Sequence, residues 1–175
     1  MPHKSCSQSL RRAYTLVEIL ITVVILGIAA AMVIPSMGDT GVLRVQAAVR
    51  QIISDISYAQ SEAVAHQRSV AVLFDPAKKA YGLIDMPASG TVTMSMAFQT
   101  TVFDASMGDA VISSVSFANS VGNANLLIFD EQGSPVLSAT SNVAPTTGQI
   151  VITGSGQTFT ISIEGYTGRV SVSGS

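Results

Sequence analysis

One carboxylate, Glu18, lies near the start of a long apolar run, where ion pairing is the chemistry open to it. The run extends from Tyr14 to Ile34 and is otherwise interrupted only by two threonines and one glycine. As a helix it would reach about 31 Å, enough to cross a bilayer core of about 30 Å. An acidic side chain in a bilayer costs about 2.5–3.5 kcal/mol on insertion scales, and a buried ammonium nearby lowers that cost. Glu18 is therefore expected either to pair with a cation or to lie at the interface, within reach of water.

A basic flank precedes the apolar run. Lys4, Arg11 and Arg12 lie before it, whereas the 20 residues after it carry only two basic side chains and one acidic one. Positive charge near a membrane span is retained on the cytoplasmic side. The sequence therefore predicts a single membrane span with a cytoplasmic N-terminus and the remainder of the chain outside.

An ordinary secretory signal peptide is the alternative for the same segment. A basic start, an apolar core and the small residues Ala29–Ala31 before a cleavage site would fit it, and would release a soluble β protein that begins at Met32. Two observations count against this alternative. The apolar run is longer than the usual 7–15 residues of such a core, and it contains Glu18.

The segment from Ala13 to Leu20, Ala-Tyr-Thr-Leu-Val-Glu-Ile-Leu, resembles the cleavage and methylation motif of type IV prepilins and type II secretion pseudopilins. That family prefers glycine before the cut and phenylalanine after it, where this chain has Ala13 and Tyr14. The resemblance implies that a prepilin peptidase cuts between Ala13 and Tyr14 and methylates the new amine of Tyr14. It also implies that Glu18, the fifth mature residue, offsets the N-terminal ammonium of a neighbouring subunit in a filament. Pro35 would be mature residue 22, where pilins often carry a proline.

The remaining chain changes from helical to strand periodicity near Ser69. From Val42 to about His66 the apolar residues recur at 3.6-residue spacing, which predicts an amphipathic helix. From Ser69 the period is two, and turn sequences separate short apolar segments. The predicted fold is α+β: a long N-terminal, partly transmembrane helix packed on an antiparallel β-sheet domain. The charged residues of the helix are expected mostly off its apolar stripe: Arg44, Arg50, Asp55, Glu62 and Arg68.

The domain organisation follows from these patterns. The helix stripe is expected to cover one face of the sheet. The four predicted segments are a leader at 1–13, a transmembrane or filament-core helix at 14–35, the amphipathic helix within 36–68, and a periplasmic β domain at 69–175. Strands are expected at 70–74, 81–84, 91–103, 111–117, 126–129, 136–139, 149–153, 158–163 and 169–172.

Later segments are similar to the GspH/FimT group of minor pseudopilins. They are Ser57–Ala65 at the helix end, the strand Ser69–Phe74, the turn Ile128–Pro135 and the terminal Thr167–Val170. The resemblance implies a minor pseudopilin of a type II secretion pseudopilus that supports protein secretion, or alternatively a minor pilin of a type IV pilus. The partners it implies are other pilins or pseudopilins, the prepilin peptidase and an inner-membrane assembly platform.

Arg169 is the one candidate for contact with nucleic acid. In FimT-like minor pilins of transformable bacteria, basic residues of the C-terminal region bind DNA, so the resemblance raises this role. However, the formal net charge of the chain is −2 and no basic residue follows Arg169. A single cation is a weak footprint for nucleic acid, so DNA is not expected as a partner. The alternative is a solvated turn residue or one paired with Glu164.

No set of residues predicts catalysis or a metal site. His66 is the only histidine outside the leader, and the single cysteine, Cys6, lies within the leader. His66 is instead expected to interact with the dipole at the helix end. Asp130 and Glu131 adjoin in a turn, where solvated carboxylates are the usual finding. The chain is therefore expected not to be an enzyme and to need no cofactor or metal.

Overall fold

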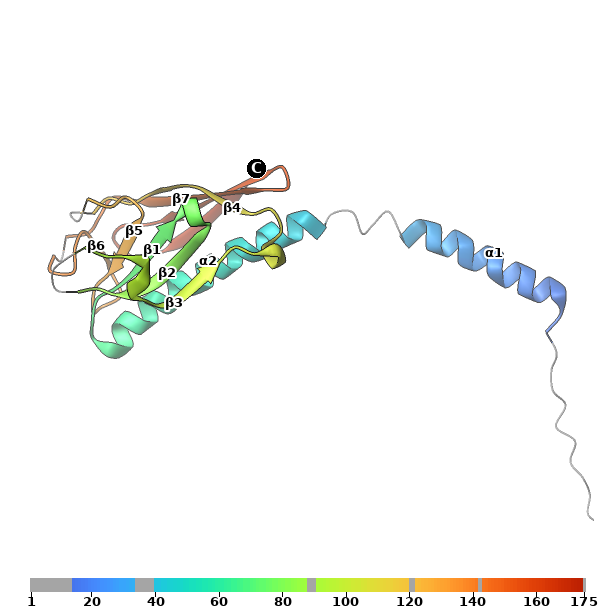
Figure 1. Cartoon of the computed structure of the whole chain (residues 1–175), viewed down its shortest axis with the longest axis horizontal. Coiled ribbons are helices and arrows are strands. Elements are labelled where there is room, and N and C mark those ends of the chain that lie inside the picture. Colours follow the sequence, from blue (N-terminus) through green and yellow to red (C-terminus); the bar gives the residue numbers. More distant parts are fainter. Residues whose placement is uncertain (1–13, 34–39, 88–90, 120–121, 142, 175) are drawn as a thin grey trace, which may run out of the picture. The chain divides into compact units, whose positions relative to one another are not determined.

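The computed structural model describes residues 14–33, 40–87, 91–119, 122–141 and 143–174. The chain divides into two compact units, Met1–Asp39 and Thr40–Ser175 (Figure 1). The predictions for the leader 1–13, including Ala13, and for Ile34 and Pro35 lie outside the described residues.

The first unit contains one described helix, α1 (Leu16–Val33), of 18 residues. At a rise of about 1.5 Å per residue it is about 27 Å long. It starts two residues after Tyr14, where the apolar run begins. Within the described ranges, no helix is long and apolar enough to cross a membrane.

The second unit begins with α2 (Thr40–His66), a helix of 27 residues. It confirms the predicted amphipathic helix. The helix ends because Gln67 adopts a left-handed backbone conformation, with φ of 51°, and Arg68 N–H then donates to the Ala63 carbonyl at 3.2 Å. Its apolar stripe is buried and comprises Val45, Ala48, Val49, Ile52, Ile56, Ala59 and Ala63.

The described strands form two antiparallel sheets (Figure 1). The five-stranded sheet has the order β3-β2-β1-β5-β6, and the four-stranded sheet has the order β4-β7-β8-β9. The first is built from β1 (Val70–Asp75), β2 (Ala80–Asp85), β3 (Ala97–Val102), β5 (Leu126–Phe129) and β6 (Pro135–Val136). The second is built from β4 (Val111–Ser116), β7 (Gly148–Gly154), β8 (Gln157–Ile163) and β9 (Val170–Gly174).

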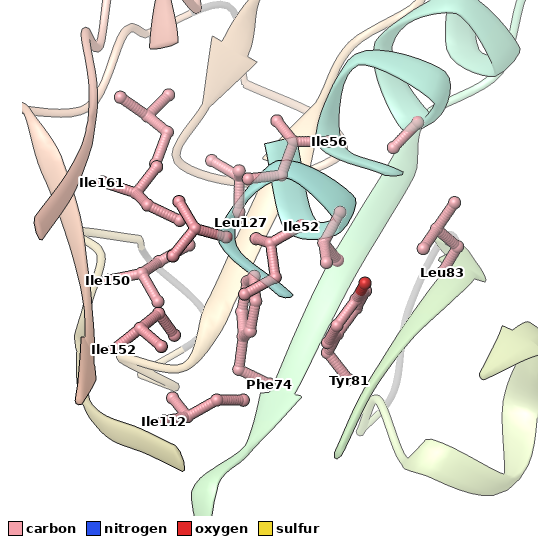
Figure 2. Close-up of a cluster of buried hydrophobic side chains, with 14 of the residues drawn as sticks. Ile52, Ile56, Phe74, Tyr81, Leu83, Ile112, Leu127, Ile150, Ile152 and Ile161 are labelled. Atoms are coloured by element: carbon pink, nitrogen blue, oxygen red, sulfur yellow. The ribbon is translucent and has the colours of Figure 1, made fainter. Parts of the chain in front are cut away.

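The main core lies where α2 meets both sheets. Figure 2 shows Ile52 and Ile56 of α2 between Ile150 and Ile161 of the four-stranded sheet and Tyr81 of the five-stranded sheet. All five side chains are fully buried. The expectation that the helix covers one face of a single sheet is therefore incomplete, because the apolar stripe is shared between two sheets.

The other face of the five-stranded sheet is also buried. Leu73 and Ala71 of β1 and Ile128 of β5 belong to a second apolar cluster, against which Met86 and Met94 pack. Both faces of β1 are thus covered, which explains why its apolar run is continuous rather than alternating.

Two predicted strands are shorter than expected. The segment 91–103 forms a strand only over Ala97–Val102, because Met94–Met96 before it is a short 3₁₀ turn. Residues 136–139 were expected to form a strand, but β6 spans only Pro135–Val136. Ser138 and Ser141 continue as a turn instead, in which Ser141 N–H donates to the Ser138 carbonyl.

Asp55 was expected off the buried stripe, and this expectation is wrong. Its side chain is buried at 5% exposure within the core side of α2. Tyr81 Oη donates to Asp55 Oδ2 at 2.6 Å, Gln51 Nε2 donates to Oδ1 at 3.0 Å, and Thr101 Oγ1 donates to Oδ2 at 3.4 Å. Three hydrogen bonds compensate for burying the carboxylate, and the two from Tyr81 and Thr101 join α2 to β2 and β3.

Candidate assembly site

The start of α1 is capped by Thr15. Its side-chain oxygen accepts from Glu18 N–H at 3.2 Å, and its carbonyl accepts from Ile19 N–H at 3.2 Å. A threonine followed three residues later by glutamate is the sequence signature of a capping box. Thr15 was not predicted to have a role, although this spacing could have indicated one. The carboxylate of Glu18 thus lies in the first helical turn, where the helix dipole favours negative charge.

The side chains of α1 that the structure describes lie at its surface. Residues 14–31 are all exposed, Tyr14 and Glu18 included. Ordinary water-soluble helices bury one apolar stripe, whereas this helix presents apolar side chains around its whole circumference. A helix that is apolar on all sides is typical of a segment that other apolar groups surround.

Three of the segments that carry the sequence resemblance come together at the far end of α2. Gln60 Nε2 donates to the Gly133 carbonyl at 3.0 Å, which joins the helix to the turn after β5. A Cβ on Gly133 would lie 3.0 Å from Val64 Cγ2, so the turn packs closely on α2. A Cβ on Gly168 would overlap Gln60 Nε2 and lie 3.3 Å from Pro135. The motifs are therefore parts of one packed junction.

The terminal turn before β9 is held by its own hydrogen bonds. Gly168 has φ of 67°, and its N–H donates to the Glu164 carbonyl at 2.9 Å. Glu164 N–H donates to the Arg169 carbonyl at 3.0 Å, and Thr167 Oγ1 donates to Glu164 Oε2 at 2.8 Å. The left-handed backbone favours glycine at 168, and an added Cβ would also displace Gln60 Nε2 from its hydrogen bond to the Gly133 carbonyl.

Substituting alanine for Gly168 is expected to lower the free energy of unfolding by about 2–3 kcal/mol, because it adds loss of the Gln60–Gly133 hydrogen bond to backbone strain. Gly156 is a matched control, with φ of 73° and no atom within 4 Å of an added Cβ. Gly156→Ala should cost only about 1 kcal/mol of strain. Denaturant unfolding of the full chain in detergent measures both, and equal losses would show that the turn is not packed against α2.

Arg169 lies apart from the two lysines that follow β1. Its side chain is exposed, and it makes no ion pair with any described residue. Its turn lies beside Pro135, near the end of β1 at which Val70 pairs with Phe129. Lys78 and Lys79 follow the opposite end of β1, about 20 Å away along six extended residues. Arg169 does contact Glu164, but through its backbone: its carbonyl accepts the hydrogen bond from Glu164 N–H.

The C-terminal end of α2 is held by a group of charged side chains. Glu62 Oε1 accepts from Arg68 Nη2 at 3.1 Å and lies 3.0 Å from His66 Nδ1. Arg68 Nη1 also pairs with Asp85 Oδ2 at 2.5 Å, so the ion pairs join the end of α2 to the end of β2. Among the described residues, no three His, Cys, Asp or Glu side chains are arranged to hold a metal ion. The position of His66 fits a structural contact at the helix end.

Asp109 anchors the turn between β7 and β8. Its Oδ2 accepts from Ser155 N–H at 2.6 Å and its Oδ1 accepts from Ser155 Oγ at 2.8 Å. The backbone hydrogen bond from Ser155, followed by its hydroxyl, holds the pKa of the Asp109 carboxyl below its ordinary value. A Cβ on Gly41 would lie 2.5 Å from Ser155 Oγ, so the β7–β8 turn also contacts the first turn of α2.

Comparisons with protein families account for most of the chain. A family model described as "Prokaryotic N-terminal methylation motif" matches residues 8–34. A second, described as "Type II transport protein GspH", matches residues 48–175. These two matches include the positions of Tyr14, Glu18 and Arg169. A search of curated proteins gives no match.

Two solved structures align with this chain. The type IV minor pilin FimU of Pseudomonas aeruginosa aligns with a TM-score of 0.51 at 20% identity, covering 74% of this chain and 87% of that protein. The minor pseudopilin EpsH of the type II secretion system of Vibrio cholerae aligns with a TM-score of 0.48 at 10% identity, covering 74% and 96%. The likeness to FimU confirms the predicted α+β, type IV pilin-like architecture.

Proposed function

Because the chain belongs to the GspH family of type II transport proteins, we propose that it is a minor pseudopilin, a structural subunit of a type II secretion pseudopilus that supports protein secretion. The observation that carries the proposal is the exposed apolar helix α1 with Glu18 in its first turn. A helix of this kind is suited to a bundle of similar helices, and the matched N-terminal methylation motif is the corresponding sequence feature.

In this proposal the precursor is held in the inner membrane through residues 14–35, with the N-terminus in the cytoplasm and the β domain in the periplasm. The assembly platform then moves α1 into a filament of other pseudopilins. The charge distribution around the apolar run supports this orientation. The positions of the basic residues give little support to a DNA-uptake role, because Arg169 and the two lysines lie at opposite ends of β1.

The processing step is the first test. We expect the protein recovered from cells to begin at Tyr14 with a methylated amine, because the methylation motif spans this position. Intact mass and N-terminal sequencing measure this directly. Ala13→Leu should leave the leader uncut, since a small residue precedes the cut in this motif. Ala31→Leu is the matched control and should be processed normally.

Other starting residues would contradict the proposal. A protein beginning at Met32 would have been cut as an ordinary signal peptide, and would lack both α1 and Glu18. An uncut Met1 would leave a membrane-anchored precursor that the peptidase does not accept. A deletion strain tests whether the protein serves secretion. Deleting the protein should reduce export of folded exoproteins. Loss of surface pili with normal export would instead assign it to a type IV pilus.

A further inference from the structure

An apolar groove lies beside α2 at the end of the four-stranded sheet, and we call it the β9 groove. Its lining combines apolar side chains of α2, β8 and β9 with one cation and one amide on the helix. The lining residues are Gln46, Val49, Arg50, Ile53, Phe159 and Val172.

The register of β9 explains why this groove is apolar. Val172 pairs with Ile161 across β8 and β9, so the two side chains share one face of the sheet. Ile161 is fully buried beneath α2, whereas Val172 is 45% exposed. The core-facing side of the sheet therefore extends one strand beyond the part that α2 covers.

The same strand has a free backbone edge. β9 is the last strand of its sheet and pairs only with β8 in the described part of the chain. Exposed sheet edges in monomeric proteins are usually blocked by charged side chains or proline, yet Val170–Gly174 contains neither. The groove thus offers unpaired N–H and C=O groups alongside an apolar surface, and an added strand can use both.

Arg50 supplies a charge at this groove. Its side chain is exposed, and it makes no ion pair with any described residue. Its neighbours on the same helix face carry no carboxylate: Gln46, Ala47, Ile53 and Ser54. A carboxylate placed beside Arg50 would therefore find an unoccupied guanidinium.

We propose that the β9 groove binds an extended segment of a different protein chain, which adds a strand to β9. Its inward side chains are apolar and rest on Val49, Phe159 and Val172, and one acidic side chain pairs with Arg50. A second copy of this chain that offered its own β9 fits less well, because Val170–Gly174 contains no acidic residue to pair with Arg50. The site lies entirely within the unit Thr40–Ser175, so it does not depend on assembly through α1.

Synthetic peptides test this proposal. The probe is a fluorescent twelve-residue peptide in which valine and threonine alternate and one central threonine is replaced with aspartate; a second peptide has lysine there. Fluorescence anisotropy with the full chain in detergent micelles measures both affinities. The aspartate peptide is expected to bind at least about tenfold more tightly than the lysine peptide. Arg50→Glu should reverse that preference, because it reverses the charge at the groove.

Two matched variants locate the binding. Val172→Lys should weaken binding about tenfold or more, whereas Val102→Lys should not, although Val102 is similarly exposed on β3 at the edge of the other sheet. Arg44→Glu controls for the charge change on α2. Equal affinity for the two peptides, or equal losses in Val172→Lys and Val102→Lys, would overturn the proposal. Self-association of the chain that Val172→Lys abolishes would overturn it too, by assigning the groove to a second copy.

Discussion

Replacing Glu18 with glutamine is expected to remove the protein from purified filaments, with a reduction of about a hundredfold or more in incorporation. In the proposed assembly, the Glu18 carboxylate is buried beside the Tyr14 ammonium of a neighbouring subunit. Leaving one member of a buried ion pair without its partner costs about 3–5 kcal/mol. Glutamine preserves the shape and the helical turn but lacks the charge. Immunoblotting of sheared filaments and of membranes measures the distribution.

A second variant separates ion pairing from helix capping, because Glu18 also lies in the turn that Thr15 caps. Thr15→Ala removes the cap at a cost of about 1 kcal/mol of helix stability but leaves the carboxylate in place. It should therefore assemble nearly as well as the original chain. Glu131→Ala, in an exposed turn of the β domain, controls for loss of a glutamate elsewhere. Normal filament incorporation of Glu18→Gln, or equal loss in Thr15→Ala, would contradict the ion-pair role.

The helices and most strands could be predicted because their signals are local. The 3.6-residue spacing from Val45 to Ala63 is determined by burial of one helix side, and the structure confirms it. The short apolar segment Leu126–Phe129 likewise forms β5 as expected. Strand order is not local: β5 pairs with β1, more than 50 residues earlier, and no periodicity along the chain indicates whether strands form one sheet or two.

The same difference between local and non-local signals applies to the candidate functional residues. Glu18 is conspicuous in the sequence because it is a single charge in an apolar run. The β9 groove has no such signal, because it depends on how far α2 extends over a sheet whose last strand lies more than 100 residues later. The same reason explains the misplacement of Asp55. A charged residue is expected at the surface unless partners are known, and its partners Tyr81 and Thr101 are 26 and 46 residues away.

Removing Asp55 is the substitution for which we expect a large loss of stability. Asp55→Ala would leave the Tyr81 hydroxyl buried without its acceptor, and such an unsatisfied group costs about 1–3 kcal/mol. Asp55→Leu combined with Tyr81→Phe should recover part of this loss, because both polar groups are then removed together. Denaturant unfolding of the full chain in detergent measures the free energy of unfolding of the original chain, of Asp55→Ala and of the double variant. Glu131→Ala, at an exposed carboxylate in a turn, is the control with an expected smaller effect.

The same contact predicts how stability changes in alkali. Burial, followed by the hydrogen bond to Asp55, raises the pKa of Tyr81 far above its ordinary value of about 10. Above pH 10 the unfolded chain therefore loses a proton that the folded chain retains. The contribution of the Tyr81 hydroxyl to the free energy of unfolding is fully present below pH 10. Above pH 10 it falls by about 1.4 kcal/mol for each pH unit. Tyr81→Phe should lack that part of the slope, so unfolding free energies at pH 9 and pH 11 should differ less than in the original chain. An identical decrease in both proteins would show that the Tyr81 hydroxyl is not kept protonated by the fold.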